Sequence, residues 1–343
     1  MKRIGYLYNQ ITDFDNLRQA EANARKGKKH QPGVKLFDQN PEGNLLLLND
    51  VLINKDFRTS EYVTFPVYEP KERLIFKLPY YPDRIVHHAI LNVLKSYFTL
   101  WFTADTYANI EGRGIHSAAN AIKSALKNKS ATQYCLKLDI KKFYPNIDHQ
   151  ILKALIRRKI KDQDLLCLLD NIIDSAEGLP IGNYLSQYFA NFYLTNFDHW
   201  LKEQQKVKYY FRYADDLVLL ASNKPELHAY LQDIRIYLRD NLKLEVKHNY
   251  QVFKVEDRGI DFVGYVFYHT HTLLRKTIKK RFAKAASKKN PNSATIASYL
   301  GWAKHANTNH LIKKLLPKRC MNTNLKITEP SRISVVSQET NCK

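Results

Sequence analysis

Two adjacent aspartates interrupt an apolar stretch in the second half of the chain, where residues 211–220 read FRYADDLVLL. The apolar neighbours predict a buried strand pair, with Tyr213-Ala214-Asp215-Asp216 at the bend between the strands. Burying two like charges is costly, so a cation is the expected partner of Asp215 and Asp216. Paired aspartates also occur in ordinary solvated turns, and a metal site therefore needs a further acid.

Asp139 is the candidate for that acid, because it stands near the end of an apolar strand predicted from Tyr134 to Ile140. A site in which two Mg²⁺ ions lie roughly 3.5–4 Å apart requires a third carboxylate from another strand. Such a site supports phosphoryl transfer, and catalysis there consists of positioning and charge neutralisation. Three acids on two strands indicate this chemistry more strongly than two acids on one.

The net charge of the chain points to a polyanionic partner. Among 343 residues, 54 Lys and Arg outnumber 33 Asp and Glu, which leaves a formal charge of +21. A basic surface attracts phosphate backbones through counterion release, and the 22 Tyr and 16 Phe supply faces on which bases could stack. For any single Tyr, packing in the core is the alternative.

Other classes of protein are disfavoured by the same sequence. Its four Cys, at positions 135, 167, 320 and 342, form no Cys-x-x-Cys pair and have no His at zinc-finger spacing, so neither a disulfide framework nor a structural zinc is indicated. No apolar h-region follows the N-terminus, and no run approaches 18 apolar residues. We therefore expect a cytoplasmic protein with no membrane segment.

The elements that would position the acids follow from local patterns. Alternating apolar residues from Tyr62 to Pro79 predict a β-hairpin with a basic tip. Apolar residues at helical spacing predict a helix over 84–101, with Asp83 as its cap. A short helix is expected around 116–128.

The rest of the chain is expected to alternate between helices and strands. We predict helices near 148–173, 186–204 and 225–241, and a further strand pair around 244–254 and 260–268. From Arg275 the chain is a basic helical region, and after Pro317 it is a polar tail expected to be loosely ordered. Residues 1–55 are a polar, basic lead-in, helical or irregular, whose Arg25–His30 run either touches nucleic acid or forms a solvated loop.

Four motifs resemble those of reverse transcriptases in order and spacing, from about Tyr62 to Tyr265. They are LKLDIKKFYPNID (136–148), LPIGNYLSQYFANFYL (179–194), RYADDLVLL (212–220) and RGIDFVGY (258–265). Most reverse transcriptases carry Gln-Gly and then Ser-Pro in the second motif, whereas the diversity-generating retroelement group carries Ile-Gly and then Ser-Gln. This chain has Ile181-Gly182 and Ser186-Gln187, and therefore resembles that group.

The resemblance implies an α+β fold of the right-hand polymerase type, with fingers, a palm containing an antiparallel sheet, and a helical thumb. It divides the chain into domains, as follows: 1–55, basic N-terminal extension; 56–130, fingers, with part of 145–180; 131–270, palm; 271–317, thumb; 318–343, polar tail. The basic thumb helices would hold the backbone of template and primer.

The resemblance also assigns the metal ligands. Asp139 and Asp215 would bind two Mg²⁺ ions, with Mn²⁺ as a possible substitute, together with the backbone carbonyl of Ile140. Asp216 would complete the acidic site. Five residues after Asp139 the family places an aromatic ring that collides with a ribose 2′-hydroxyl, and this position is Tyr144, so the product would be DNA. Core packing is the alternative role for Tyr144.

Further residues are expected at the incoming deoxynucleoside triphosphate (dNTP). Lys71 and Arg73 at the hairpin tip resemble triphosphate-gripping residues, because Arg offers a bidentate fork and Lys a point charge. A solvated turn is the alternative. Lys247 lies near the place of the family's general-acid lysine. The resemblance places Gly182, Gln187 and Ile181 in the same dNTP-binding site.

Ile181 stands where other reverse transcriptases present a Gln that hydrogen-bonds near the nucleotide sugar. Losing that contact should weaken selection by roughly 1 kcal/mol, or several-fold. The resemblance implies error-prone copying at template adenines, known as mutagenic retrohoming, with template RNA, an RNA-DNA hybrid, dNTPs and a small accessory variability protein as partners. The alternatives are a retron-like or phage-defence reverse transcriptase and an inactive RNA-binding scaffold. The alternative role for Ile181 is merely to fill apolar space.

Overall fold

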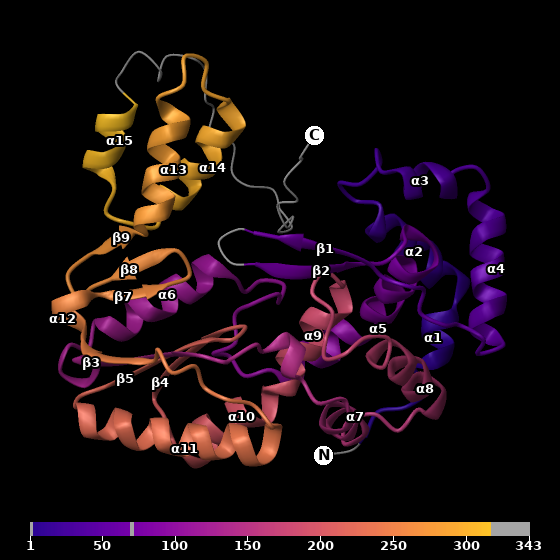
Figure 1. The fold of residues 1–343 in the computed structure, drawn as a ribbon, viewed down its shortest axis with the longest axis horizontal. Helices are drawn as coiled ribbons and strands as arrows, with labels where there is room; N and C mark the ends of the chain where they lie inside the picture. Colours follow the sequence, from indigo (N-terminus) through magenta and orange to yellow (C-terminus); the bar gives the residue numbers. More distant parts are fainter. Residues whose placement is uncertain (1–2, 69–71, 317–343) are drawn as a thin grey trace. The chain divides into compact units, whose positions relative to one another are not determined.

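The computed structural model describes residues 3–68 and 72–316, which form two compact units (Figure 1). The larger unit holds the described residues up to 263, together with 267–269. The smaller unit holds residues 264–266 and the described residues from 270 onward. Among the helices in these ranges, none combines the length and apolarity that a bilayer crossing requires.

The N-terminal lead-in is helical. Between residues 3 and 55 the described chain forms α1 (Tyr8–Thr12), α2 (Phe14–Ala24), α3 (Pro32–Phe37) and α4 (Pro41–Ile53). Asp13 caps α2 by accepting hydrogen bonds from the backbone N–H groups of Asp15 and Asn16, and Asn40 caps α4. The hydrophobic core of the larger unit includes residues of its sheet and also Leu17, Val34, Leu48 and Leu52 of the lead-in. The lead-in is therefore an integral part of the larger unit.

The predicted hairpin and the helix after it are both present. Strands β1 (Val63–Val67) and β2 (Arg73–Lys77) pair in antiparallel register, with Phe65 opposite Ile75. A kinked turn, Tyr80–Arg84, leads into α5 (Ile85–Trp101), and α6 (Ile115–Leu126) follows. The prediction that Asp83 caps the helix was wrong. Asp83 is fully buried, and its Oδ1 accepts a hydrogen bond from the backbone of Ser60 at 2.9 Å.

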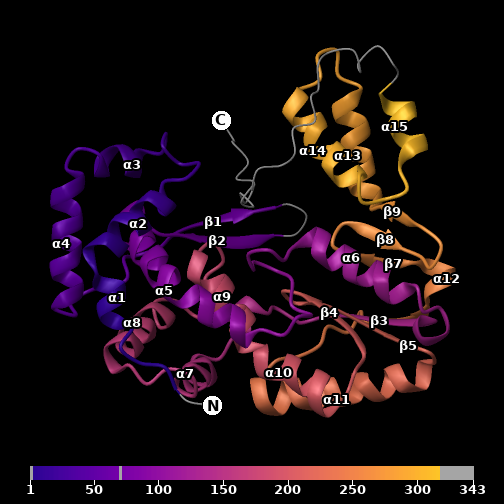
Figure 2. The same cartoon turned by 180° about the vertical axis from the view of Figure 1, so that it is seen from behind.

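An antiparallel sheet lies at the centre of the larger unit. In the described chain its strand order is β4-β5-β3-β6, made of β3 (Tyr134–Asp139), β4 (Tyr209–Tyr213), β5 (Asp216–Ala221) and β6 (Gln251–Lys254). In both views α11 (Lys224–Leu242) lies along one face of this sheet and α6 lies on the other side (Figure 1 and Figure 2). The predicted strand over 244–254 is shorter than expected, and β6 pairs with β3.

The helical segments between β3 and β4 are more broken than the sequence predicts. Residues 148–173 form two helices, α7 (His149–Arg157) and α8 (Gln163–Ile173), because Asp162 caps α8 and also accepts hydrogen bonds from the backbone of Leu7 and Tyr8. A short 3-10 turn, Tyr144–Asn146, precedes α7. Next come α9 (Tyr184–Tyr193), α10 (Thr195–His199) and a π-helical turn, Trp200–Gln204.

After β6 the chain continues through short elements into the smaller unit. These are α12 (Val255–Arg258), β7 (Ile260–Phe262), β8 (Tyr265–Phe267) and β9 (Thr272–Leu274), followed by α13 (Lys276–Ala286), α14 (Ser293–Ala303) and α15 (Asn309–Leu315). Phe282, Ile296 and Leu316 are buried together in the core of the smaller unit. The predicted basic helical region after Arg275 is thus present, whereas the tail after residue 316 lies outside the described residues.

Candidate active site

The three predicted acids meet at one end of the central sheet. Asp139, at the end of β3, lies opposite Asp216, at the start of β5. Asp215 lies in the turn between β4 and β5, and its carbonyl accepts a hydrogen bond from the backbone N–H of Ile140 at 3.2 Å. Antiparallel pairing of β3 with β5 thus brings Asp139 together with acids that lie 76 and 77 positions further along the sequence.

The turn carrying Asp215 has a backbone conformation that few residues adopt. Ala214 has a φ of +53°, in the left-handed region, where an L-amino acid with a Cβ is disfavoured. This conformation lets β4 reverse into β5 within two residues, so that Tyr213 lies opposite Asp216. The surrounding contacts must hold Ala214 in place, because the residue itself does not favour this geometry.

The carboxylates experience one another's charge. Burial raises the pKa of Asp215 to about 6, and the neighbouring charge of Asp139 contributes to the increase. Lys247 Nζ lies 2.6 Å from Asp139 Oδ1, and the backbone N–H of Lys247 donates to the carbonyl of Asp139 at 2.9 Å. Lys137 Nζ lies 3.6 Å from Asp216 Oδ2. A lysine thus lies beside each flanking acid, and burial together with the charge of Asp139 disfavours the ionisation of Asp215.

This donor set fits a divalent cation. Asp139 Oδ1 is buried, and although it makes a charge contact with Lys247, no hydrogen bond of suitable geometry reaches it from the described residues. In residues 3–68 and 72–316, no three His, Cys, Asp or Glu side chains are arranged as a complete metal site. A cation here would therefore use the carboxylates of Asp139 and Asp215 together with other oxygen atoms, such as a backbone carbonyl or water.

Tyr144 lies within electrostatic reach of Asp215, and Arg73 lies within electrostatic reach of Tyr144. The pKa of the Tyr144 hydroxyl is raised to about 12, first by burial and then by the charge of Asp215, while Arg212 and Arg73 act in the opposite direction. Arg73 is the first residue of β2 and its side chain is exposed. The fold thus brings the turn before α7 close to Asp215 and the hairpin close to that turn. Lys71, the other predicted triphosphate ligand, lies outside the described residues.

The segment Ile181-Gly182 is fixed against β2. The carbonyl of Ile181 accepts a hydrogen bond from the backbone N–H of Phe76 at 2.8 Å. Gly182 has a φ of +121°, and a Cβ there would lie 2.7 Å from the carbonyl oxygen of Phe76, so a side chain cannot be accommodated without displacement. Asn183 donates to the Tyr62 hydroxyl at 2.9 Å. Gln187 is half-buried near the start of α9.

One residue of the site could have been found in the sequence but was not. Lys137 lies two positions before Asp139 in β3, and residues two apart on a strand face the same side. Besides its ion pair with Asp216, Lys137 donates a hydrogen bond to the carbonyl of Asp261. These residues and Arg258 line a cavity of about 270 Å³ next to the acids. The cavity therefore offers charges of both signs beside the candidate metal ligands.

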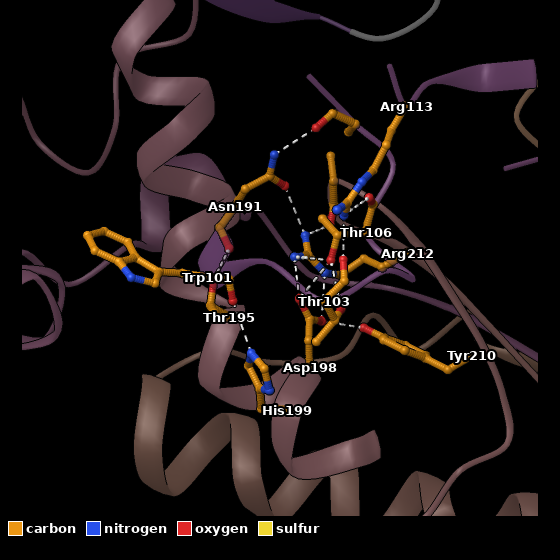
Figure 3. Close-up of polar contacts among 12 residues, drawn as sticks. Trp101, Thr103, Thr106, Arg113, Asn191, Thr195, Asp198, His199, Tyr210 and Arg212 are labelled. Atoms are coloured by element: carbon orange, nitrogen blue, oxygen red, sulfur yellow. Dashed lines mark hydrogen bonds and ion pairs between the residues drawn. The ribbon is translucent and has the colours of Figure 1, made fainter. Parts of the chain in front are cut away.

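A buried polar network behind the acids was also not predicted. Figure 3 shows the side chains of Arg212, Asp198, Asn191, Tyr210 and Thr106 pointing toward one another. Arg212 and Asp198 are both fully buried, and their closest charged atoms, Nη2 and Oδ2, lie 2.5 Å apart. The network joins β4, α9, α10 and the loop before α6, and it therefore fixes the strand that ends at the turn carrying Asp215.

The sequence profile of the family "Reverse transcriptase (RNA-dependent DNA polymerase)" matches residues 69–267, which is more than half of the chain. Protein YkfC of Escherichia coli (strain K12) is 24% identical over 326 residues, covering 80% of this chain and 84% of YkfC. The group II intron-encoded protein LtrA of Lactococcus lactis subsp. cremoris is 27% identical over 143 residues, covering 38% of this chain and 23% of LtrA.

Among solved structures, apo telomerase from Candida Tropicalis aligns with a TM-score of 0.49 and 14% identity, covering 74% of this chain and 54% of the telomerase chain. The family match includes β3, the β4–β5 turn and all three acids. The chain belongs to the reverse transcriptases, which are RNA-directed DNA polymerases, and it has their right-hand polymerase fold.

Proposed function

We propose that Asp139, Asp215 and Asp216 form the centre at which this reverse transcriptase joins deoxynucleotides into DNA. The observation that carries the proposal is the pairing of Asp139 with Asp216 next to the turn at Asp215, where burial and mutual repulsion raise the pKa of Asp215 to about 6. Two carboxylates held in this way require a cation in order to ionise together. Asp139, Asp215 and the carbonyl of Ile140 would hold Mg²⁺.

Bound Mg²⁺ would supply charge stabilisation for the primer hydroxyl and the triphosphate. The chain's own residues would do the remaining work. Arg73, together with Lys71, would grip the triphosphate. Tyr144, whose pKa is raised by burial and by the charge of Asp215, would block a ribose 2′-hydroxyl. Lys247, which contacts Asp139 through its backbone and its side chain, would donate a proton to a leaving group.

The proposed division of the chain follows from these roles. Residues 56–130 would act as fingers, 131–270 as the palm that carries the acids, and 271–317 as a thumb. The smaller unit contains the basic helix α13, which suits phosphate contacts with an RNA-DNA hybrid. Binding of the hybrid should therefore weaken steeply as the salt concentration rises.

Primer extension tests the assignment of the acids. With an RNA template, a DNA primer, dNTPs and Mg²⁺, the Asp215→Ala variant should lose at least about 100-fold in rate, because the site loses a charge that the reaction requires. Asp240→Ala is the matched control, since Asp240 is exposed on α11 and pairs with its neighbour Arg239. An Asp215→Ala variant as active as the control would refute the site. If the wild type itself incorporates no nucleotide, the result would instead favour the alternative of an inactive RNA-binding scaffold.

We further propose that copying is error-prone at template adenines and serves a diversity-generating retroelement. Ile181 supports this, because it occupies the position of a sugar-contacting Gln and cannot form that hydrogen bond. Its carbonyl is held by β2, which fixes the backbone while leaving an aliphatic side chain at the proposed nucleotide site. The element's template RNA and a small accessory protein would be the partners.

Ile181→Gln should lower misincorporation opposite adenine several-fold, in line with roughly 1 kcal/mol for one hydrogen bond. Ile181→Leu is the matched control, since it keeps an aliphatic side chain of the same size and should leave the error rate unchanged. Equal error rates in all three proteins, measured by sequencing primer-extension products, would contradict the role of Ile181.

The relatives support a second candidate function. LtrA is a group II intron-encoded protein, and this chain is similar to it over 143 residues. The same polymerase would then copy intron RNA. The chain spans less than a quarter of LtrA, so the comparison reaches a limited part of that protein. Wild-type errors that are rare and evenly spread over the four template bases would favour this candidate over the retroelement.

A further inference from the structure

Arg212 uses every hydrogen-bond donor of its guanidinium group. Nε donates to Asp198 Oδ1 at 2.8 Å and Nη2 to Asp198 Oδ2 at 2.5 Å. Nη2 also donates to Thr106 Oγ1 at 3.3 Å, and Nη1 donates to Asn191 Oδ1 at 3.1 Å. The fifth bond runs from Nη1 to the carbonyl oxygen of Ala214 at 3.0 Å. A fully buried Arg must be paired, and the bonds to Asp198 already satisfy that requirement.

The bond to Ala214 serves a different purpose, because Ala214 is the left-handed residue of the catalytic turn. The Ala214 carbonyl belongs to the peptide group that enters Asp215. The next peptide group, which leaves Asp215, is held by the bond from Ile140 N–H to the Asp215 carbonyl. The backbone on both sides of Asp215 is therefore anchored, on one side by Ile140, which follows β3, and on the other by Arg212.

The anchor itself is rigid. Asp198 is fully buried and also accepts a hydrogen bond from the Tyr210 hydroxyl at 2.7 Å (Figure 3). The backbone of Arg212 is fixed on both sides as well, since its N–H donates to the carbonyl of Asp105 at 2.9 Å and its carbonyl accepts from Tyr107 N–H at 3.0 Å. A guanidinium held at so many points can fix the peptide orientation at Ala214.

We propose that Arg212 is a positioning residue that holds the Ala214 peptide so that the Asp215 carboxylate faces Asp139 in the geometry that binds the catalytic cation. The proposal rests on the proposed role of Asp215 as a metal ligand. This positioning role differs from a purely structural one, because cation binding would depend on a single bond of the network, the hydrogen bond from Arg212 to the Ala214 carbonyl. Loss of a bond that does not involve Arg212, such as the one from the Tyr210 hydroxyl to Asp198, should lower stability and leave cation binding unchanged.

Arg212→Lys and Tyr210→Phe separate the two roles. A Lys ammonium is a single point, which can pair with Asp198 but cannot also reproduce the fork that reaches Ala214. Tyr210→Phe removes the hydroxyl bond to Asp198 from the same network and leaves Arg212 in contact with Ala214. Both variants should melt at a lower temperature than the wild type.

The affinity for Mn²⁺ is measured by electron paramagnetic resonance on the full chain without nucleotide. Arg212→Lys should weaken Mn²⁺ binding about 3- to 10-fold, the effect of one lost hydrogen bond. The Mg²⁺ concentration that gives half-maximal primer extension should rise by a similar factor. Tyr210→Phe should leave both quantities at the wild-type value. Equal Mn²⁺ affinity in Arg212→Lys and the wild type would overturn the proposal, as would equal weakening in both variants.

A double variant keeps the test decisive if Arg212→Lys does not fold. Arg212→Gln combined with Asp198→Asn leaves no unpaired buried charge, and the Gln side chain is two atoms shorter than the Arg side chain that bonds to Ala214. It should weaken Mn²⁺ binding as Arg212→Lys does, and wild-type affinity would overturn the proposal. Asp215→Ala is measured in parallel. If Asp215→Ala binds Mn²⁺ as tightly as the wild type, the metal site itself is wrongly assigned, which is a different failure from that of Arg212.

Discussion

Gly182→Ala is the substitution that probes the proposed nucleotide site most directly. Gly182 has a φ of +121°, and an added Cβ would meet the carbonyl oxygen of Phe76 at 2.7 Å and Cγ2 of Ile75 at 3.2 Å. Ordinary contact begins near 3.4 Å, so the backbone of the loop and that of β2 must separate by about 0.7 Å. The hydrogen bond from Phe76 N–H to the Ile181 carbonyl lies between the same two segments and would lengthen.

The cost of this substitution has two parts. Holding a residue with a Cβ in this region of φ costs about 1–3 kcal/mol, and weakening the Phe76–Ile181 hydrogen bond adds about 1 kcal/mol. The loop can relieve both by moving away from β2, which displaces Ile181. Displacements approaching 1 Å at a reacting centre cost about 100-fold in rate. We therefore expect Gly182→Ala to lower kcat/KM for dNTP about 10- to 100-fold.

Gly27→Ala is the matched control for backbone strain. Gly27 has a φ of +70°, and no atom in the described chain lies within 4 Å of an added Cβ. The control should lose stability and keep its kcat/KM. Single-nucleotide primer extension at several dNTP concentrations, corrected for the folded fraction from melting curves, measures the difference. If Gly182→Ala loses stability and retains wild-type kinetics, the segment Ile181-Gly182 does not line the nucleotide site.

Two further predictions concern discrimination and pH. Tyr144→Val should raise incorporation of ribonucleotides relative to deoxynucleotides by about 10-fold or more, measured by primer extension with each nucleotide, because the ring that would block the 2′-hydroxyl is gone; an unchanged ratio would assign Tyr144 to packing. Burial lowers the pKa of His87 to about 3, so its proton binds the unfolded chain first, and stability is lost as pH falls below about 6.5. At pH 5 the cost is about 2 kcal/mol relative to pH 8, and His87→Leu should remove that difference in urea unfolding.

The elements nearest the acids could be predicted from the sequence because their signals are local. Alternating apolar residues define β1 and β2, and the run from Tyr134 forms β3 as expected. The bend at Asp215 lies between two strands, as the flanking apolar residues indicated. Each of these patterns is contained within a short stretch of consecutive residues. Asp139 was found because a two-metal site needs a third carboxylate from another strand, and the structure places it opposite Asp216.

Predictions failed where a distant residue supplied a partner. Asp83 has the position of a helix cap, but its carboxylate is fully buried and bonds to the backbone of Ser60. The break between α7 and α8 follows from Asp162, which bonds to the N-terminal segment about 155 positions away. Neither interaction is visible in a local window, because a cap and a long-range contact use the same side-chain oxygens.

Lys137 and Arg212 show that a charged residue within an apolar strand can be used to predict a long-range ion pair. Each is a cation inside an apolar strand and lies within three residues of a candidate metal-binding acid. A buried cation needs an anion as its partner, because an unpaired charge in the protein interior costs free energy. Lys137 pairs with Asp216, while Arg212 turns to Asp198, an acid in a helix whose neighbour Phe197 is also fully buried. An acid and a base that each interrupt an apolar run are therefore candidates for pairing, even when no local pattern joins them. For Arg212 this reasoning yields the partner but not the bond to Ala214, because that bond depends on the left-handed turn that the fold imposes.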